Sequence, residues 1–500
     1  MTLSVAAVTF VTVATVVLGT YGLRLSRTTS DFYVASRAVS PAGNAAAISG
    51  EYLSAASFLG VAGLIMTYGA DMLWYPVGYA AGYLVMLLLV AAPLRRSGAY
   101  TLPDFAESRL DSGFVRRIAS VLVVVIGWFY LVPQLLGAGL TLRTITGAPQ
   151  WVGALTVTVV VVANVLAGGM RSITLVQAFQ FWLKLTAISV PAVFLLLTWR
   201  AQGSPDLTSA DPSAWALPLS GFGGREHPLY GTYSIVLATF LGTMGLPHVL
   251  VRFYTNPDGR ASRRTTLAVL GLLGTFYLIP PVYGALGRLY VPELLRTGNT
   301  DAVVLVLPQA VFGGVGGRML GALVAAGAFA AFLSTSSGLI VSVAGVLSQD
   351  VLLPSIRGFR VATFLAAVPP LMMAVLSADL AIARSVALAF AVAASSFCPL
   401  LMLGIWWRGL TDVGAALGLL AGGGIAAIAV VITMVHPPDG GWAESLLTQP
   451  AAWTVPIAFT VMIAGSLATR HRRNVHIGHI MARMHLPEGL GLSGARSGRE

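Results

Sequence analysis

The chain has 500 residues, of which 56% are hydrophobic and only 10% charged, and its mean hydropathy is +0.81. This composition excludes a soluble domain with a surface of mixed charge and indicates a membrane protein. The formal net charge of +11 comes almost entirely from arginines in short loops between apolar runs, which argues against a nucleic-acid binder.

The apolar runs predict thirteen spanning helices, because about 20 apolar residues cross the hydrocarbon core of a bilayer. The first run is not a cleaved signal peptide, since its arginines (Arg24, Arg27 and Arg37) follow the run and none precedes it. The predicted spans are 2–22, 43–67, 71–94, 115–142, 151–168, 172–198, 229–253, 265–289, 318–348, 357–377, 380–404, 412–435 and 452–469.

Basic residues in short loops indicate which side of a membrane each loop occupies, because they concentrate on the cytoplasmic side. The arginines after the first span therefore place the N-terminus outside, and thirteen spans place the C-terminus inside. On this alternation about 22 basic residues, Arg109, Arg116 and Arg252 among them, lie inside and about seven outside. The long loops 199–228 and 290–317 are then external, and the apolar stretch 302–312 is expected to lie across that face as a lid.

The second predicted span carries a carboxylate, Glu51, near its middle, with Ser49, Gly50, Ser54 and Ser57 around it. An isolated acid at that depth costs about 2.5–3.5 kcal/mol, so Glu51 must face a partner, a cavity or an ion. Opened backbone is tolerated there only when it is buried in protein or lines a cavity. The pattern favours an interrupted helix at a cation–solute site. The alternative is a packing face on which Glu51 pairs with a neighbouring helix.

The ninth predicted span contains four consecutive hydroxyl residues, 334–337, before Gly338. Na⁺ prefers oxygen ligands, and the adjacent Ser334 and Thr335 offer two hydroxyls to one cavity. In the alternative interpretation these hydroxyls bond to carbonyls of the preceding turn.

Lys184 is the only lysine of the chain and lies near the middle of the sixth predicted span. An ammonium at this depth is a functional candidate by default. It can pair with Glu51 or Asp71, hold an anionic substrate, or extend to the membrane surface.

A carboxylate substrate is expected at the N-terminus of a half-helix, where free N–H groups and the helix dipole attract anions. The second and seventh spans both contain a Phe-Leu-Gly triplet, at 58–60 and 240–242, and both look interruptible. The candidates are Ser54 and Ser57 in the second span and Gly242, Thr243 and Gly245 in the seventh.

Several blocks of this sequence resemble the sodium:solute symporter family, and most closely its acetate-permease branch of cation–acetate symporters. The blocks occur in the family's order over roughly 30–350 and are Ser30-Asp31-Phe32-Tyr33-Val34-Ala35-Ser36-Arg37, the segment 45–60 with Leu53-Ser54-Ala55-Ala56-Ser57-Phe58-Leu59-Gly60, Tyr100-Thr101-Leu102-Pro103-Asp104-Phe105, Gly168-Gly169-Met170-Arg171, and Gly245-Leu246-Pro247-His248-Val249-Leu250-Val251-Arg252-Phe253.

The resemblance implies an all-α polytopic membrane protein of about thirteen helices, with a five-plus-five inverted-repeat core. It divides the chain into a leading helix (1–22), two repeats (43–198 and 229–404), two trailing helices (412–469) and a basic cytoplasmic tail (470–500).

The resemblance also implies site residues. The sodium ligands would be the carbonyls of Ala45, Ile48 and Ala331 with the hydroxyls of Ser334 and Thr335. Asp71, Trp74 and Gln134 would line the substrate cavity, for which the residues themselves also make Glu51 and Lys184 candidates, although Trp74 or Tyr79 could instead belong to an interfacial aromatic belt. Gln177 stands where sugar-transporting members carry Asp, which leaves H⁺ open as the coupling ion. Ala47 and Tyr52 replace polar sugar-binding positions and make a sugar substrate unfavourable.

These observations predict a secondary active transporter of the plasma membrane that couples cation entry, Na⁺ or alternatively H⁺, to uptake of acetate, propionate or pyruvate. The alternatives are another small solute, such as an amino acid, and a membrane sensor, for which the tail is too short. An enzyme is disfavoured, because neither a nucleophile–base pair nor a phosphate loop is present. The single Cys398 and the spacing of the histidines indicate no metal cluster or organic cofactor. Beyond the substrate and the lipid bilayer, a small partner subunit is compatible with the sequence, which does not identify one.

Overall fold

The computed structural model describes residues 2–23, 39–207, 215, 227–352, 355–376, 382–435 and 440–487. The block at 30–37, the arginines that set the predicted orientation, most of the loop 199–228 and the end of the tail lie outside the described residues.

Every regular element among the described residues is a helix, and no strand occurs among them. The α-helices are α1 (Thr2–Leu23), α3 (Pro41–Tyr52), α4 (Val61–Tyr68), α5 (Trp74–Val85), α6 (Ala91–Arg96), α7 (Leu102–Leu110), α8 (Gly113–Thr146), α9 (Gln150–Ala201), α11 (Pro228–Gly245), α12 (Pro247–Val251), α13 (Gly259–Tyr277), α14 (Pro280–Tyr290), α15 (Glu293–Thr297), α16 (Val303–Phe312), α17 (Gly314–Asp350), α18 (Ile356–Leu376), α19 (Ile382–Trp406), α20 (Asp412–Leu419), α21 (Ile425–Val435), α22 (Gly441–Thr448), α23 (Ala451–Ala468) and α24 (Ile477–His485). The short π and 3₁₀ segments are η2 (Ala56–Gly60), η3 (Gly69–Leu73), η4 (Met86–Val90), η5 (Arg252–Thr255), η6 (Thr300–Ala302), η7 (Leu420–Gly424) and η8 (Arg470–Arg472).

Twelve described stretches are long and apolar enough to cross a membrane. One of them, Ala56–Arg96, has 41 residues, and at about 1.5 Å per residue it would be about 60 Å long, twice the hydrocarbon core. Gly69, with φ of 77°, interrupts this stretch between α4 and α5. We therefore interpret it as two crossings, as the predicted spans 43–67 and 71–94 require, which brings the number to thirteen. α9 contains the fifth and sixth predicted spans as two apolar stretches, Gln150–Ala167 and Ser172–Ala201.

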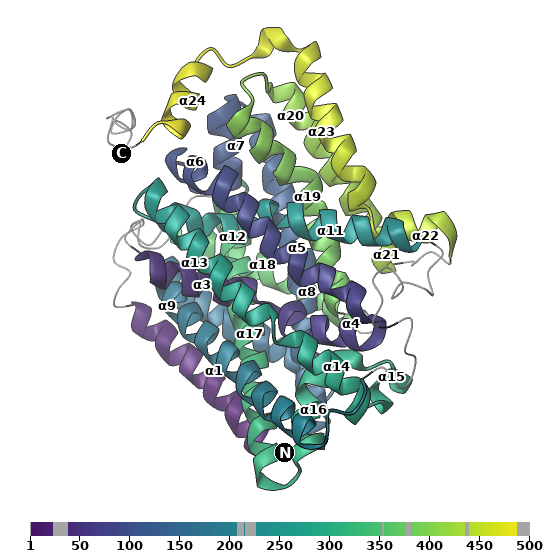
Figure 1. Ribbon diagram of the computed structural model, residues 1–500. Coiled ribbons are helices and arrows are strands. Elements are labelled where there is room, and N and C mark those ends of the chain that lie inside the picture. The colour runs from purple at the N-terminus through teal and green to yellow at the C-terminus, as the bar shows by residue number, and fades with distance from the viewer. Residues whose placement is uncertain are drawn as a thin grey trace.

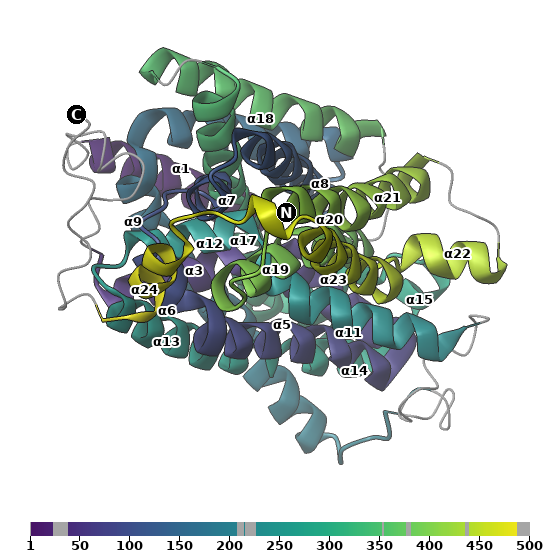
Figure 2. The same cartoon turned by 90° about the horizontal axis from the view of Figure 1, so that it is seen from above.

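The centre of the bundle is formed by α17, whose most apolar window is completely buried, whereas the corresponding window of α1 is 28% buried. Viewed from above, α17 and α19 lie among the other helices, and α1, α18 and α21 lie toward the outside (Figure 2). The small residues of α17, such as Gly327 and Ala331, let neighbouring helices approach closely. This central helix carries the four predicted hydroxyl residues.

The two ends of the bundle are built differently. Figure 1 shows α6, α7 and α24 at one end and α14, α15 and α16 at the other. The predicted lid, 302–312, forms η6 and the apolar helix α16, which packs against α17, α14 and α4. At the opposite end α24 buries Met481 and Met484, and Arg483 donates to the backbone carbonyl of Ser97. The tail is therefore partly docked, where the sequence predicted a solvated end, because apolar positions recur on one face of α24.

Candidate functional site

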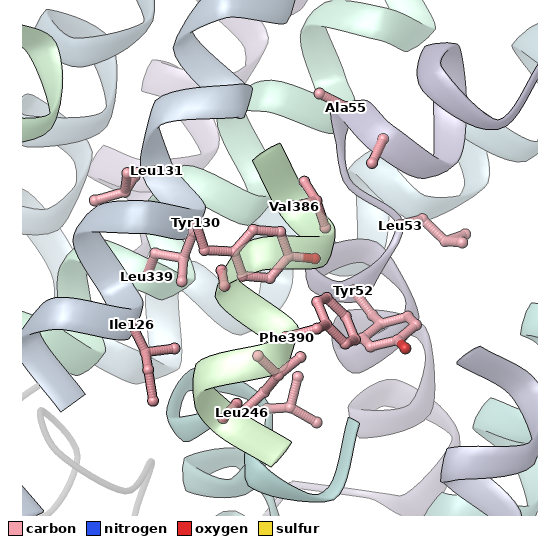
Figure 3. Packing of buried hydrophobic residues seen from close by; sticks show 14 of the residues in the cluster. Tyr52, Leu53, Ala55, Ile126, Tyr130, Leu131, Leu246, Leu339, Val386 and Phe390 are labelled. Atoms are coloured by element: carbon pink, nitrogen blue, oxygen red, sulfur yellow. The ribbon is translucent and has the colours of Figure 1, made fainter. Parts of the chain in front are cut away.

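The second predicted span is broken in the middle of the bundle. α3 ends at Tyr52, and Leu53 and Ser54 are not helical before the helix resumes at Ala55. Figure 3 shows this thin stretch of chain between Leu53 and Ala55, beside the rings of Tyr52 and Phe390. The backbone N–H of Ala55, which begins the second half-helix, donates to Gln134 Oε1 at 2.8 Å. Gln134 is fully buried and occupies the position at which a carboxylate oxygen was expected.

The seventh predicted span is also broken, at Leu246 between α11 and α12. A Cβ added at Gly242 would lie 2.5 Å from the Phe390 carbonyl oxygen, and one at Gly245 would lie 2.3 Å from that of Ala393. Both glycines therefore allow α11 to pack directly on the backbone of α19. Their predicted contact with substrate stays a prediction.

The predicted hydroxyls beside the two breaks bond to tyrosines. Thr243 Oγ1 lies 2.8 Å from the Tyr52 hydroxyl, and Ser57 Oγ lies 2.9 Å from the Tyr277 hydroxyl. Ser54 lies in the break itself and is 1% exposed. These three predicted residues are therefore buried at the same level of the bundle, where the two broken helices meet aromatic side chains.

Two further tyrosines on α5 complete this region. The ring of Tyr52 meets the rings of Tyr83 and Tyr79 edge-on, with centroids 4.8 and 5.9 Å away, and Phe390 lies 5.0 Å from Tyr79. The hydroxyls of Tyr79 and Tyr83 are buried, and neither has a hydrogen-bond partner within the described part of the chain. A buried unpaired hydroxyl costs about 1–3 kcal/mol, so these two groups indicate where a polar ligand would bind.

Asp71 and Trp74, predicted to line the same cavity, lie in different surroundings. Asp71 is buried in the turn η3, whereas the Trp74 side chain at the start of α5 is 37% exposed. This exposure favours the alternative interpretation of Trp74 as a residue of an aromatic belt at the membrane surface.

The predicted cation ligands of α17 bond to the carbonyls next to the break. Ser334 Oγ donates to the Gly50 carbonyl oxygen at 2.7 Å, with the Ala331 carbonyl 3.0 Å away, and Thr335 Oγ1 donates to the Glu51 carbonyl at 2.6 Å. The Gly50 and Glu51 carbonyls come later in the chain than those of Ala45 and Ile48, the predicted ligands, which lie within helix α3. The set of five sodium ligands stays a prediction.

Lys184 of α9 reaches the same position. Its ammonium donates to the carbonyls of Gly50 and Leu53, the latter at 2.8 Å, and to Ser334 Oγ at 2.6 Å. The side chain is fully buried. Of the three roles left open for Lys184, extension to the membrane surface is thus ruled out, and its direct partners in the structure are neutral oxygens of the broken helix and of α17.

Glu51 has a buried partner, Arg252, which the sequence analysis placed in a cytoplasmic loop. Arg252 Nε lies 2.8 Å from Glu51 Oε2, and both side chains are 1% exposed. Arg252 also donates to Thr174 Oγ1 at 2.7 Å and to Gln177 Oε1, and Gln177 Nε2 donates to the Ser334 carbonyl at 2.8 Å. A carboxylate and a guanidinium thus neutralise each other beside the cation position.

Arg252 and Arg109, both counted among the cytoplasmic arginines, are buried against other parts of the protein. Arg252 follows α12 directly, and Arg109 is also 1% exposed and donates to the Gly404 and Trp407 carbonyls at 2.7 and 2.9 Å. Burial lowers the pKa of Arg109 to about 10. The position of Arg252 at the end of an apolar run, together with the need of Glu51 for a partner, was the signal that could have identified the pair.

A separate cavity of about 410 Å³ opens toward the end of the bundle that holds α15. Its polar lining includes Arg143, Arg384 and Asp301. The Ile382 N–H donates to Asp301 Oδ2 at 3.1 Å, and Arg384 bonds to the Tyr68 hydroxyl at 2.5 Å. Burial raises the pKa of Asp301 to about 6, and Arg384 partly opposes this rise.

The sequence matches the model of the sodium:solute symporter family over residues 32–422. Among curated relatives, the uncharacterised symporter YwcA of Bacillus subtilis (strain 168) is 31% identical over 468 residues, covering 89% of this chain and 90% of the relative. The monocarboxylic acid transporter of Corynebacterium glutamicum is 30% identical over 501 residues, covering 91% of this chain and 89% of the relative.

Solved transporter structures share the fold. A Na⁺-coupled sialic acid symporter in its substrate-bound outward-open state aligns with a TM-score of 0.70 at 14% identity, covering 94% of this chain and 97% of that one. The nucleobase–cation symporter Mhp1 aligns with a TM-score of 0.59 at 16% identity, covering 91% and 99%. With both structures the likeness concerns the helical architecture, since the identity is low.

Proposed function

The chain belongs to the sodium:solute symporter family, and we propose that it carries out cation-coupled symport of a short-chain monocarboxylate, such as acetate, propionate or pyruvate, by alternating access. The supporting observation is the junction of the broken helix α3–η2 with the buried, unpaired hydroxyls of Tyr79 and Tyr83. The name of the Corynebacterium relative, a monocarboxylic acid transporter, supports the same substrate class.

The junction suits a small acid with a short apolar part. A carboxylate could accept hydrogen bonds from the two tyrosine hydroxyls and from the Ala55 N–H in place of Gln134, where the half-helix dipole favours negative charge. Phe390 and the faces of the tyrosine rings supply apolar contact for a methyl or ethyl group. Ser54, Ser57, Thr243 and Gln134 are the proposed neighbours of the substrate.

The coupling ion follows from the family and from the Na⁺-coupled neighbour, which support Na⁺, with H⁺ as the alternative. For Na⁺, the ligands to test are those implied by the resemblance, namely Ala45, Ile48, Ala331, Ser334 and Thr335. The proposed orientation, with the N-terminus outside a plasma membrane and the C-terminus inside, is tested separately from transport.

The test of function is uptake into proteoliposomes, with Na⁺ and pH gradients imposed one at a time. Labelled acetate, propionate and pyruvate should accumulate and compete with one another, whereas proline should not compete. Tyr79→Phe and Tyr83→Phe should each raise the KM for acetate about tenfold through loss of one buried hydrogen bond. Tyr233→Phe, on the exposed surface of α11, is the matched control. Accumulation of proline with no uptake of any carboxylate would overturn the proposal.

The test of orientation uses single cysteines in a Cys398→Ala background. Thr297→Cys, in the predicted external loop, should react with an impermeant thiol reagent in intact cells. Val475→Cys, which is 90% exposed in the tail, should react only after permeabilisation. Labelling of position 475 in sealed cells would place the tail outside.

A further inference from the structure

Lys184 lies beside the position where the family resemblance places a coupling Na⁺, and it binds one of the five implied ligands, Ser334. The hydroxyl of Ser334 and the carbonyls next to the break of α3 point to one position between α17, α3 and α9, and the Lys184 ammonium occupies it. An ammonium has three donors, and Gly50, Leu53 and Ser334 provide three acceptors. We propose that Lys184 is the built-in cation of this site, that the site binds no Na⁺, and that the alternative coupling ion named above, H⁺, drives the proposed transport in place of Na⁺.

The bonding within the site supports this assignment. Ser334 Oγ accepts from Lys184 while its own hydroxyl donates to Gly50 or Ala331. Thr335 Oγ1 donates to the Glu51 carbonyl. The two hydroxyls of the predicted ligand pair are therefore engaged with the lysine and with the broken helix. Na⁺ would have to compete with the ammonium for Ser334 Oγ and for the Gly50 and Leu53 carbonyl oxygens.

The balance of charge points the same way. Glu51 is the carboxylate of this cluster, and its ion pair with Arg252 leaves the two of them neutral. A protonated Lys184 then contributes one positive charge, which is what a bound Na⁺ would contribute. A second cation among the same oxygens would lie within a few ångströms of the ammonium, and repulsion between like charges is weakly screened in a buried site.

The broken helix explains why a lysine fits. Leu53 lies outside the regular helix, so its carbonyl can turn toward α9, and the Gly50 carbonyl belongs to the last turn of α3, where carbonyls lack helical partners. A Cβ on Gly50 would lie 2.2 Å from the Gln177 carbonyl oxygen of α9. Gly50 thus brings α3 close enough to α9 for the lysine, about two turns beyond Gln177, to reach both carbonyls.

The first experiment measures Na⁺ binding to purified protein, without any substrate. Replacing choline by Na⁺ at constant ionic strength should leave the Tm of the wild-type protein unchanged, because a ligand raises Tm only when it binds the folded state. Lys184→Ala should become stabilised by Na⁺, since the acceptors lose their donor. Ser334→Ala in the Lys184→Ala background should abolish that response. Ser337→Ala, whose hydroxyl bonds within its own helix to Leu333, should retain it.

Because Lys184 is the only lysine, an isotope label in the lysine side chain gives a single NMR signal. Titration with Na⁺ should leave the chemical shift of the wild-type signal unchanged. The substitution Ser334→Ala should itself change the chemical shift, because it removes one acceptor of the ammonium. This measurement and the wild-type Tm decide the question even if Lys184→Ala does not fold. A saturable Na⁺-specific rise in Tm, or a saturable shift of the lysine signal by Na⁺, would overturn the proposal.

Uptake supplies the remaining measurement and rests on the proposed carboxylate transport. With the membrane potential clamped, acetate uptake by the wild-type protein should follow an imposed pH gradient and change less than about twofold when Na⁺ is removed, whereas dependence on Na⁺ of about tenfold or more would contradict the proposal. Absence of carboxylate uptake under every gradient would refute the proposed function and leave the result of the Na⁺-binding experiment standing.

Discussion

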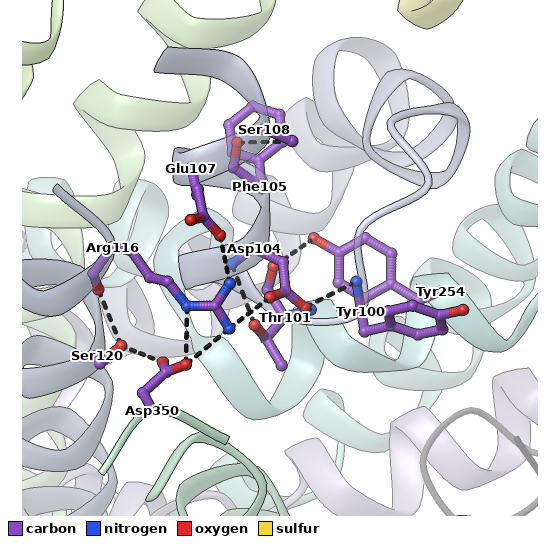
Figure 4. A network of polar contacts seen from close by, with 10 residues as sticks. All are labelled: Tyr100, Thr101, Asp104, Phe105, Glu107, Ser108, Arg116, Ser120, Tyr254 and Asp350. Carbon is purple, nitrogen blue, oxygen red and sulfur yellow. Dashed lines mark hydrogen bonds and ion pairs between the residues drawn. The ribbon is translucent and has the colours of Figure 1, made fainter. Parts of the chain in front are cut away.

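Two polar clusters in this molecule, each centred on a basic side chain, both include residues of α17. They hold the basic group with different kinds of partner. At the buried cluster, the Lys184 ammonium is fully buried and is held by two carbonyls and a hydroxyl. At the end of the bundle, Arg116 is held by three carboxylates, namely Asp104 Oδ1 at 2.9 Å, Glu107 Oε2 and Asp350 Oδ1 at 2.7 Å, and its side chain is 23% exposed (Figure 4).

The difference shows how access to water decides the partners of a cation. Around Arg116, water can solvate the excess negative charge of three carboxylates, although burial still raises the pKa of Asp104. In the interior, where charges are poorly solvated, Glu51 is matched by one arginine and Lys184 is held by the dipoles of two carbonyls and a hydroxyl. Arg116 therefore joins α7, α8 and α17 at one end of the bundle, whereas the interior cluster holds its basic group with neutral oxygens of the backbone and of Ser334.

The largest effect is expected from breaking the buried ion pair. Arg252→Ala would leave Glu51 buried without its guanidinium, at an expected cost of about 3–5 kcal/mol in the free energy of unfolding. Thermal unfolding in detergent measures it. Arg472→Ala, which breaks an exposed pair with Asp412 at 2.8 Å, is the control and should cost about 0–1 kcal/mol. Equal losses from the two variants would contradict the distinction between buried and exposed clusters.

A smaller effect is expected at the half-exposed cluster. Arg116→Ala removes charged hydrogen bonds to three acids that water can then reach, so the cost should be about 2–3 kcal/mol. The doubly changed Arg116→Ala, Asp350→Asn protein should recover part of this loss, because repulsion among the remaining carboxylates is lower. No recovery in the measured Tm would mean that Arg116 acts through packing and not through its charge.

The third prediction concerns Asp301, a partly buried acid that makes no ion pair with the nearby Arg384 in the structure. Because its pKa in the folded state, about 6, lies above the ordinary value, folding takes up a proton. The contribution of Asp301 to the free energy of unfolding is therefore full below about pH 4 and is lost as pH rises to about 6. Because Asp301 lines a cavity, this contribution is expected to be about 1–2 kcal/mol. Asp301→Asn should remove this part of the pH dependence of Tm. An unchanged pH profile would show that water or Arg384 already keeps this carboxylate ionised.

Local patterns in the sequence predicted the two breaks but not what surrounds them. The small and hydroxyl residues around Gly50 indicated an interruption of the second span, and the Phe-Leu-Gly triplet at 240–242 marked the seventh span as interruptible without locating its break at Leu246. The helical fold was likewise predicted, since long apolar runs restrict a chain to membrane helices, whereas the family was predicted from the resemblance of separate sequence blocks.

Pairings between distant residues could not be derived in this way. Glu51 clearly required a partner, yet Arg252 lies 201 positions away, and loop arginines were assigned by alternation alone. Burial of both residues emerges only when α3 and η5 are packed against α9. The same is true of Gly242 and Gly245, whose absent side chains serve the contact with α19, a requirement that no local pattern reveals.

The docked C-terminal helix has a consequence for biosynthesis. Arg483 and the carbonyl of Ser97 that it binds are separated by 386 positions, and the ring of His485 meets Trp406 with centroids 5.0 Å apart. A ribosome adding about 5–20 residues per second needs roughly 20 to 80 seconds to travel from one partner to the other. α24 can therefore dock onto α6 only after residue 483 has been added, and chains released before that point would lack this contact.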